Sequence, residues 1–116
     1  MARIMVLPKI RGTQIGLRDP TSIDLLKADI TAGSYAYAEA RGQIGGIIDT
    51  RGTYYVLEGH HRMAAALEIF QETGDDTPVR SLLSWGRWSL VTKPPTGSRS
   101  FPARSRWGAF RNWLGF

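Results

Sequence analysis

The pattern of apolar and polar positions predicts two helices. In residues 19–33, DPTSIDLLKADITAG, isoleucine and leucine recur at helical spacing, and Gly33 is placed to end the helix. A second helix is predicted from His61 to Thr73, because this run is rich in alanine and other helix formers and is followed by Gly74. Both helices carry enough apolar side chains to pack on a shared core.

Between and after these helices the pattern changes to short apolar runs. GGIID (residues 45–49) and TYYVLE (53–58) flank a Thr-Arg-Gly turn, as in a β-hairpin, and VRSLLSW (79–85) predicts a further strand. Residues 3–10 are predicted as an edge strand or a lead-in, and residues 34–42 as a short helix or a loop. The order helix, hairpin, helix and strand predicts a small α+β domain.

Composition narrows the class of protein. A chain of 116 residues is long enough for one domain with a single modest core. The absence of cysteine excludes disulfides, cysteine-ligated zinc and a cysteine nucleophile. No segment has the length and apolarity of a membrane span, and no signal-peptide core is recognisable at the N-terminus. We therefore expect a soluble protein that is made in the cytoplasm and has no membrane partner.

The net charge of +5 is unevenly distributed. Residues 1–83 carry nine basic and ten acidic side chains, whereas residues 84–116 carry six basic side chains, no acidic ones and all four tryptophans. Residues 93–106 form a linker-like stretch rich in proline, glycine, serine and arginine. The predicted organisation is a domain over residues 1–91 and a basic aromatic C-terminal extension over 92–116, and such asymmetry favours a polyanionic partner.

The end of the extension supports more than one interpretation. Trp107, Phe110 and Trp113 recur at helical spacing, which indicates a short amphipathic helix docked on the domain. The same segment interleaves aromatic rings with arginines, a pattern typical of nucleic-acid binding, and contact with a membrane or a partner helix is a third interpretation. The arginines expected to bind nucleic acid are Arg104, Arg106 and Arg111.

The junction between the predicted strand 53–58 and the alanine-rich helix concentrates ionisable groups: Glu58, Gly59, His60, His61 and Arg62. A helix N-terminus favours an anion, glycine allows an oxyanion close to the backbone, and arginine offers a bidentate fork. Histidine and glutamate are the side chains most used for proton transfer. The junction is therefore a candidate phosphate site, although a solvated, capped helix start is the simpler alternative.

The segment YYVLEGHHRMAAALEIF (residues 54–70) resembles the signature of the ParB/sulfiredoxin superfamily: a strand, a Gly-x-x-Arg turn and an alanine-rich helix. The Gly-His-His-Arg form is similar to that of its ParB-like nuclease branch. RGTQIG (residues 11–16) and the helix with its Gly33 extend the resemblance over about Leu7 to Leu83. It implies a small ParB/sulfiredoxin-like fold with a mixed sheet and packed helices.

The resemblance also implies residue roles. Gly59, Arg62 and Gln14 correspond to phosphate-binding positions. His60 stands where CTP-hydrolysing ParB proteins have glutamate and sulfiredoxins have the reactive cysteine, so neither of those chemistries is expected. His60 would instead act as a general base or ligate a divalent metal, Mg²⁺ or Mn²⁺, with His61 assisting. Glu58 would orient a histidine or hold the metal.

The predicted function is a ParB-like nuclease acting on DNA. The C-terminal segment is similar to the ends of Rhs and related polymorphic toxins, in which such a domain is secreted as part of a larger protein and acts in the target-cell cytoplasm. That similarity implies a cognate immunity protein as a partner. Two alternatives are a nucleotide-dependent phosphotransferase or NTPase, and a non-enzymatic module that binds DNA or nucleotides.

Overall fold

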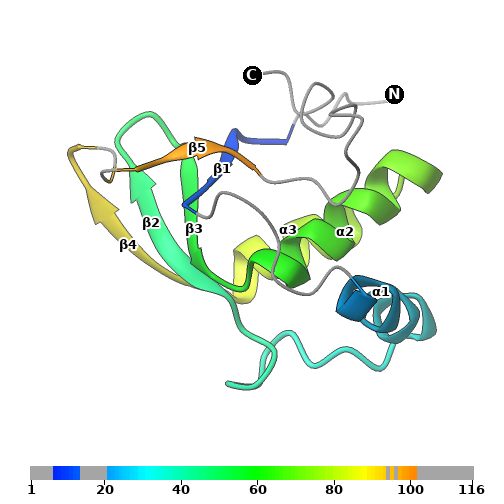
Figure 1. Cartoon of the computed structure of the whole chain (residues 1–116). Coiled ribbons are helices and arrows are strands. Elements are labelled where there is room, and N and C mark those ends of the chain that lie inside the picture. Colours follow the sequence, from blue (N-terminus) through cyan, green and yellow to red (C-terminus); the bar gives the residue numbers. More distant parts are fainter. Residues whose placement is uncertain (1–6, 14–20, 94, 96, 102–116) are drawn as a thin grey trace, which may run out of the picture.

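The computed structural model describes residues 7–13, 21–93, 95 and 97–101. In this part of the chain three helices lie together on one side of a five-stranded mixed sheet (Figure 1). The α+β prediction is therefore confirmed. The elements in chain order are β1 (Ile10–Gly12), α1 (Thr21–Ala32), β2 (Gly45–Asp49), β3 (Tyr54–Glu58), α2 (His60–Thr73), α3 (Thr77–Trp85), β4 (Arg87–Val91) and β5 (Arg99–Ser100).

The strands follow the order β4-β2-β3-β1-β5 across the sheet. β2 and β3 form the predicted antiparallel hairpin, β1 pairs with β3 in parallel and β2 pairs with β4 in parallel. β5 pairs antiparallel with β1, so β4 and β5 lie at opposite edges of the sheet. The central strand β3 leads directly into α2, which places the first turn of that helix at the end of the sheet.

The turn of the β2–β3 hairpin is fixed by the carboxylate of Asp49. Its Oδ1 accepts the backbone N–H groups of Arg51 at 2.9 Å and Thr53 at 3.0 Å, and its Oδ2 accepts the phenol O–H of Tyr55 at 2.8 Å. These hydrogen bonds hold the pKa of Asp49 below its ordinary value although the side chain is buried, and the hydrogen bond from Thr53 contributes most. Gly52 has a φ of +85°, which this tight turn requires.

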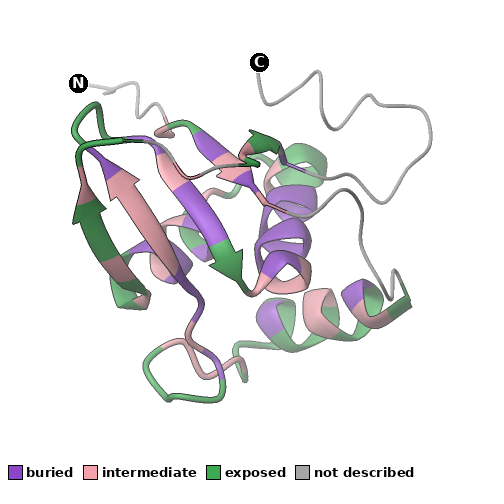
Figure 2. Cartoon of the chain, turned by 60° about the vertical axis from the view of Figure 1, so that its left-hand side comes forward, coloured by how far each residue is buried: buried purple, intermediate pink, exposed green. Residues whose placement is uncertain are grey.

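The core lies between the sheet and α2, the most buried helix (Figure 2). Side chains from Met63 to Leu67 are completely buried. Three of them are alanines, and such small side chains allow the sheet, α1 and α3 all to approach the helix closely. Ile10, Ile23 and Val79 bring β1, α1 and α3 into the same cluster. The alanine-rich composition of α2 thus follows from its central position.

The prediction of a strand over residues 79–85 is wrong, because this segment is part of the helix α3. Pro78 stands in the first turn, where its fixed φ favours a helix and its missing N–H costs nothing. Val79, Leu82 and Leu83 recur at helical spacing and are buried. The strand that joins the sheet in this region is β4, in which Trp88 packs edge-on against Tyr54 with ring centroids 4.9 Å apart.

Three further expectations can be compared with the structure. Strand β1 begins at Ile10, where the predicted lead-in ends, and residues 34–42 form turns. Part of the predicted linker, Arg99–Ser100, is the edge strand β5, and Phe101 after it is fully buried. The last fifteen residues, and with them the predicted docked helix, lie outside the described residues. No helix among the described residues is long and apolar enough to cross a membrane.

Candidate functional site

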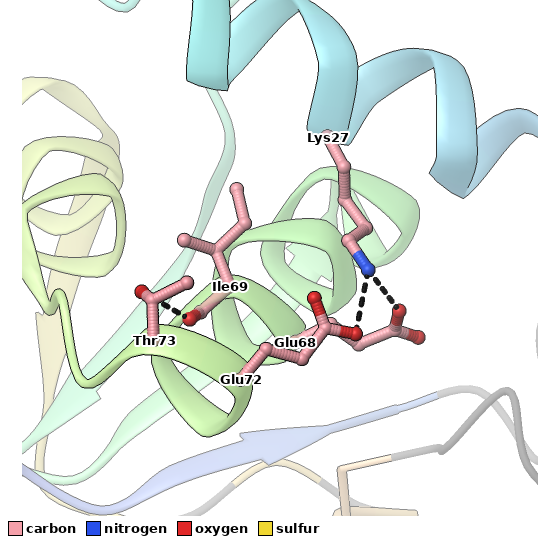
Figure 3. A network of polar contacts seen from close by, with 5 residues as sticks. All are labelled: Lys27, Glu68, Ile69, Glu72 and Thr73. Atoms are coloured by element: carbon pink, nitrogen blue, oxygen red, sulfur yellow. Dashed lines mark hydrogen bonds and ion pairs between the residues drawn. The ribbon is translucent and has the colours of Figure 1, made fainter.

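Helices α1 and α2 lie side by side and run in the same direction. Residues from the first turns of both helices line one pocket, and residues from their last turns, Ile30 and Thr73 among them, line another. Between the two ends, Lys27 Nζ binds Glu68 Oε1 at 3.2 Å and Glu72 Oε2 at 2.8 Å (Figure 3). The positive ends of both helix dipoles therefore meet at the first pocket.

The first pocket is an open cavity of about 550 Å³. One wall is the start of α1, with Ser22, Leu25 and Leu26, and the other is the start of α2, with Gly59 to Arg62. The predicted residues Gly59, His60, His61 and Arg62 are thus brought together around one cavity. The pocket combines an apolar wall with the polar, positive end of α2.

Gly59 is required by the backbone at this junction. Its φ of +95° and ψ of 29° lie in the left-handed region, and a Cβ at this position would collide with the side chain of Ile44. The N-cap residue Gly59 has no side chain to cap α2, and the first helical hydrogen bond runs from Met63 N–H to Gly59 O at 3.0 Å. Backbone N–H groups of the first turn point out of a helix end, so this end is suited to an anion.

His60 is the first residue of α2, and its side chain is only 1% exposed. The Nε2 atom accepts the backbone N–H of Thr13 at 3.0 Å, and the ring stacks on Phe101 with centroids 5.5 Å apart. With Nε2 acting as an acceptor, the neutral ring carries its proton on Nδ1, which is buried and has no partner among the described residues. Burial, with a contribution from the neighbouring His61, lowers the pKa of His60 to about 4.

This geometry gives His60 a different role from the predicted general base. The lone pair that would accept a proton is already bonded to Thr13, and the other ring nitrogen carries hydrogen. His60 instead joins three segments of the chain: the start of α2, the residue after β1, and the end of β5 at Phe101. His61 is less buried and lines the pocket. Of the two histidines, His61 is the more exposed.

Arg62 is half-buried and is held by a tyrosine that the sequence analysis did not identify. The guanidinium hydrogen-bonds the phenol of Tyr35, which in turn donates its O–H to the carbonyl of Gly42 at 2.6 Å. Burial raises the pKa of Tyr35, while the Arg62 charge acts in the opposite direction. The guanidinium carries five N–H groups, so it can keep this contact and still donate to a ligand.

Glu58 does not join the pocket, contrary to the role predicted for it. It lies on the exposed surface of the sheet, with its Oε2 3.7 Å from Arg87 Nη2. Gly45 of β2 lies between the two residues in the strand register, and its lack of a side chain lets them meet across that strand. Within the described part of the chain, no three side chains of histidine, aspartate or glutamate gather as a metal site.

Four predicted site residues lie outside the described residues: Gln14, Arg104, Arg106 and Arg111. The residues that sequence reasoning missed are Thr13, Ser22, Leu25, Tyr35 and Phe101. Only Leu25 gives a local signal, since it is an apolar residue on an otherwise polar face of α1. The others reach the site through tertiary contacts.

Comparison of the chain with protein-family models, with curated proteins and with solved structures found no match.

Proposed function

We propose that the pocket at the start of α2 binds a phosphate of nucleic acid and that the domain is a nuclease that hydrolyses phosphodiester bonds in DNA. One observation carries this proposal. Residues from the first turns of two parallel helices, among them His61 and Arg62, all line one open cavity of about 550 Å³. Helix N-termini and arginine are the groups that proteins use most to bind phosphate.

In this proposal each residue at the pocket has a separate role in the reaction. The first-turn N–H groups of α2 and Arg62 bind the non-bridging oxygens, and Tyr35 keeps Arg62 in position. His61 accepts a proton from the attacking water as the new P–O bond forms. The bond to the leaving oxygen breaks, and that oxygen receives a proton to become a hydroxyl. His60 holds the helix start in place through Thr13 and Phe101.

The expected Mg²⁺ or Mn²⁺ receives little support from the described side chains. The described residues that line the pocket include no carboxylate, Glu58 pairs with Arg87, and the Nε2 atom of His60 is already an acceptor. Carboxylate oxygens are the ligands that magnesium prefers, so these donors do not fit a metal held by the protein alone.

The test is cleavage of supercoiled plasmid and of single-stranded DNA and RNA, each with EDTA or with added Mg²⁺ or Mn²⁺. We expect cleavage to fall by about 10²- to 10⁴-fold in His61→Ala, the size typical of general acid–base catalysis. Arg62→Gln should lose activity as well, whereas the exposed Arg51→Gln should not. Absence of cleavage by the wild-type chain under every condition would contradict the nuclease proposal.

A non-enzymatic module that binds nucleic acid is the second candidate. The observation that favours it is the same lack of a carboxylate among the described residues that line the pocket. This candidate predicts binding of DNA that weakens steeply with salt, loss of binding in Arg62→Gln, and no turnover.

The proposal extends to the biological setting implied by the resemblance to polymorphic toxins. A toxin domain that cleaves DNA in the target-cell cytoplasm requires a cognate immunity protein. Expression of the wild-type chain in bacteria should then arrest growth, and His61→Ala should relieve the arrest. Normal growth with the folded wild-type chain would argue against the effector role.

A further inference from the structure

Arg62 separates two cavities. Besides the first pocket, a second cavity of about 200 Å³ shares Arg62 and Leu26 with it. The second cavity is lined by the segment after α1, including Tyr35 and Arg41. The two cavities are therefore neighbours, with Arg62 and Leu26 between them.

Two arginines line the second cavity. Arg62 is held by Tyr35, whereas the Arg41 side chain is 76% exposed and, within the described residues, forms a weak ion pair with the exposed Glu39 at 3.4 Å. Exposed pairs of this kind contribute little free energy, so Arg41 is readily redirected to a ligand. Asp29 also lines this cavity, and its carboxylate disfavours an anion on its own side. An anion is therefore expected between Arg41 and Arg62.

The first cavity also has an apolar wall. Leu25 is 73% exposed, and with Leu26 it forms an apolar wall beside the α2 N-terminus. A phosphate alone makes no use of this wall. A sugar or an unpaired base attached to the phosphate packs against it, whereas in a duplex the bases are turned inward and only the backbone is presented.

We propose that the two cavities form one groove for single-stranded nucleic acid, holding two consecutive phosphates. One phosphate lies at the start of α2 beside Arg62, and the next lies between Arg62 and Arg41. The unpaired nucleotide at the first phosphate packs against Leu25 and Leu26. This inference rests on the proposed phosphate site, and it names the substrate class: a single-stranded polynucleotide in preference to a free nucleotide or a duplex.

The test is fluorescence anisotropy with a labelled five-nucleotide single-stranded DNA, whose phosphorothioate linkages slow cleavage. Unlabelled inorganic phosphate, a nucleoside 5′-monophosphate, a nucleoside triphosphate and a short duplex serve as competitors. Arg41→Gln is compared with Arg51→Gln. Both remove one exposed positive charge, but Arg51 lies in the β2–β3 turn, at the opposite end of β3 from α2.

We expect Arg41→Gln to weaken binding of the oligonucleotide about tenfold and to reduce the slope of log affinity against log salt by about one. The nucleoside monophosphate occupies only the first cavity. It should therefore compete equally well in Arg41→Gln and in the wild type. Arg51→Gln should bind like the wild type. Arg62→Gln should lose both ligands.

The other outcomes distinguish failure of the two-phosphate groove from failure of the phosphate site. If the monophosphate competes and Arg62→Gln abolishes binding, but Arg41→Gln behaves like Arg51→Gln, the two-phosphate groove is wrong and the phosphate site stands. A duplex or a triphosphate that competes better than the single strand would also overturn the groove. If no phosphate compound competes and Arg62→Gln has no effect, both the groove and the phosphate site fail.

Discussion

At the scale of single residues, the backbone conformation at Gly59 determines where the ionisable side chains of the junction lie. Gly59 adopts a left-handed conformation against Ile44, and this turns the chain so that His60 enters the core and His61 lines the pocket. The run of ionisable residues could be recognised from the sequence. Which histidine is buried could not, because that depends on Thr13 and Phe101, residues far from it in the sequence.

Gly59→Ala should therefore be strongly destabilising. The left-handed conformation alone costs about 1 kcal/mol for alanine, and the collision with Ile44 should bring the loss to about 2–4 kcal/mol in urea unfolding. Gly33→Ala is the matched control, since Gly33 has a φ of +79° but nothing within 4 Å of an added Cβ. Equal losses in the two variants would show that Ile44 does not restrict this position.

His60 should make the stability of the domain depend on pH. Its pKa is about 4 when folded and about 6.5 when unfolded, so between these values the unfolded chain binds more protons. The stabilising contribution is fully present above about pH 6.5 and is lost as the pH falls toward 4, by a total of the order of 2–3 kcal/mol. His60→Gln should flatten the unfolding free energy in this window relative to the wild type. Parallel curves for the two proteins would contradict the buried, neutral state of His60.

At the scale of elements, the parallel packing of α1 and α2 forms the pocket, and Lys27 links the two helices through Glu68 and Glu72. Burial disfavours its charge, but the hydrogen bonds to Glu72 and Glu68 outweigh this effect and raise the pKa of Lys27. Glu68 is itself buried, so Lys27 neutralises a carboxylate that has little access to water.

Lys27→Met should destabilise the domain by about 1–3 kcal/mol, because it leaves Glu68 buried without its cation. Glu72→Gln, which removes the more exposed partner, should change the unfolding free energy by less than about 1 kcal/mol. Thermal and urea unfolding of the two variants measure this difference. A Lys27→Met protein as stable as the wild type would show that apolar contacts alone hold α1 against α2.

A helix or strand could be predicted where the sequence signals for it lie within its own residues. Helix α1, the β2–β3 hairpin and helix α2 have complete signals in their own residues, including the glycines that end them. Helix α3 does not. Its Val-Arg-Ser-Leu-Leu-Ser-Trp run is short enough to fit either a strand or a helix, and packing of Val79 and Leu82 in the core decides between them. β5 is only two residues long and forms because β1 provides its partner.

At the scale of the whole molecule, the site depends on contacts that no local pattern predicts. Glu58 was expected to act beside the histidines, but the parallel pairing of β2 with β4 brings Arg87 within reach of it and draws it to the other side of the junction. Tyr35 joins the site only because the segment after α1 folds back toward Arg62. Of the residues singled out at the junction, the structure places Gly59 to Arg62 around one cavity and Glu58 outside it.

The most direct test of the account is an NMR titration of the ¹⁵N-labelled chain with inorganic phosphate. If the pocket binds phosphoryl oxygens, the amide signals of His61 and Arg62 should move saturably, together with those at the start of α1, and Arg62→Gln should abolish the movement. A titration that leaves these signals in place while the protein remains folded would contradict the account.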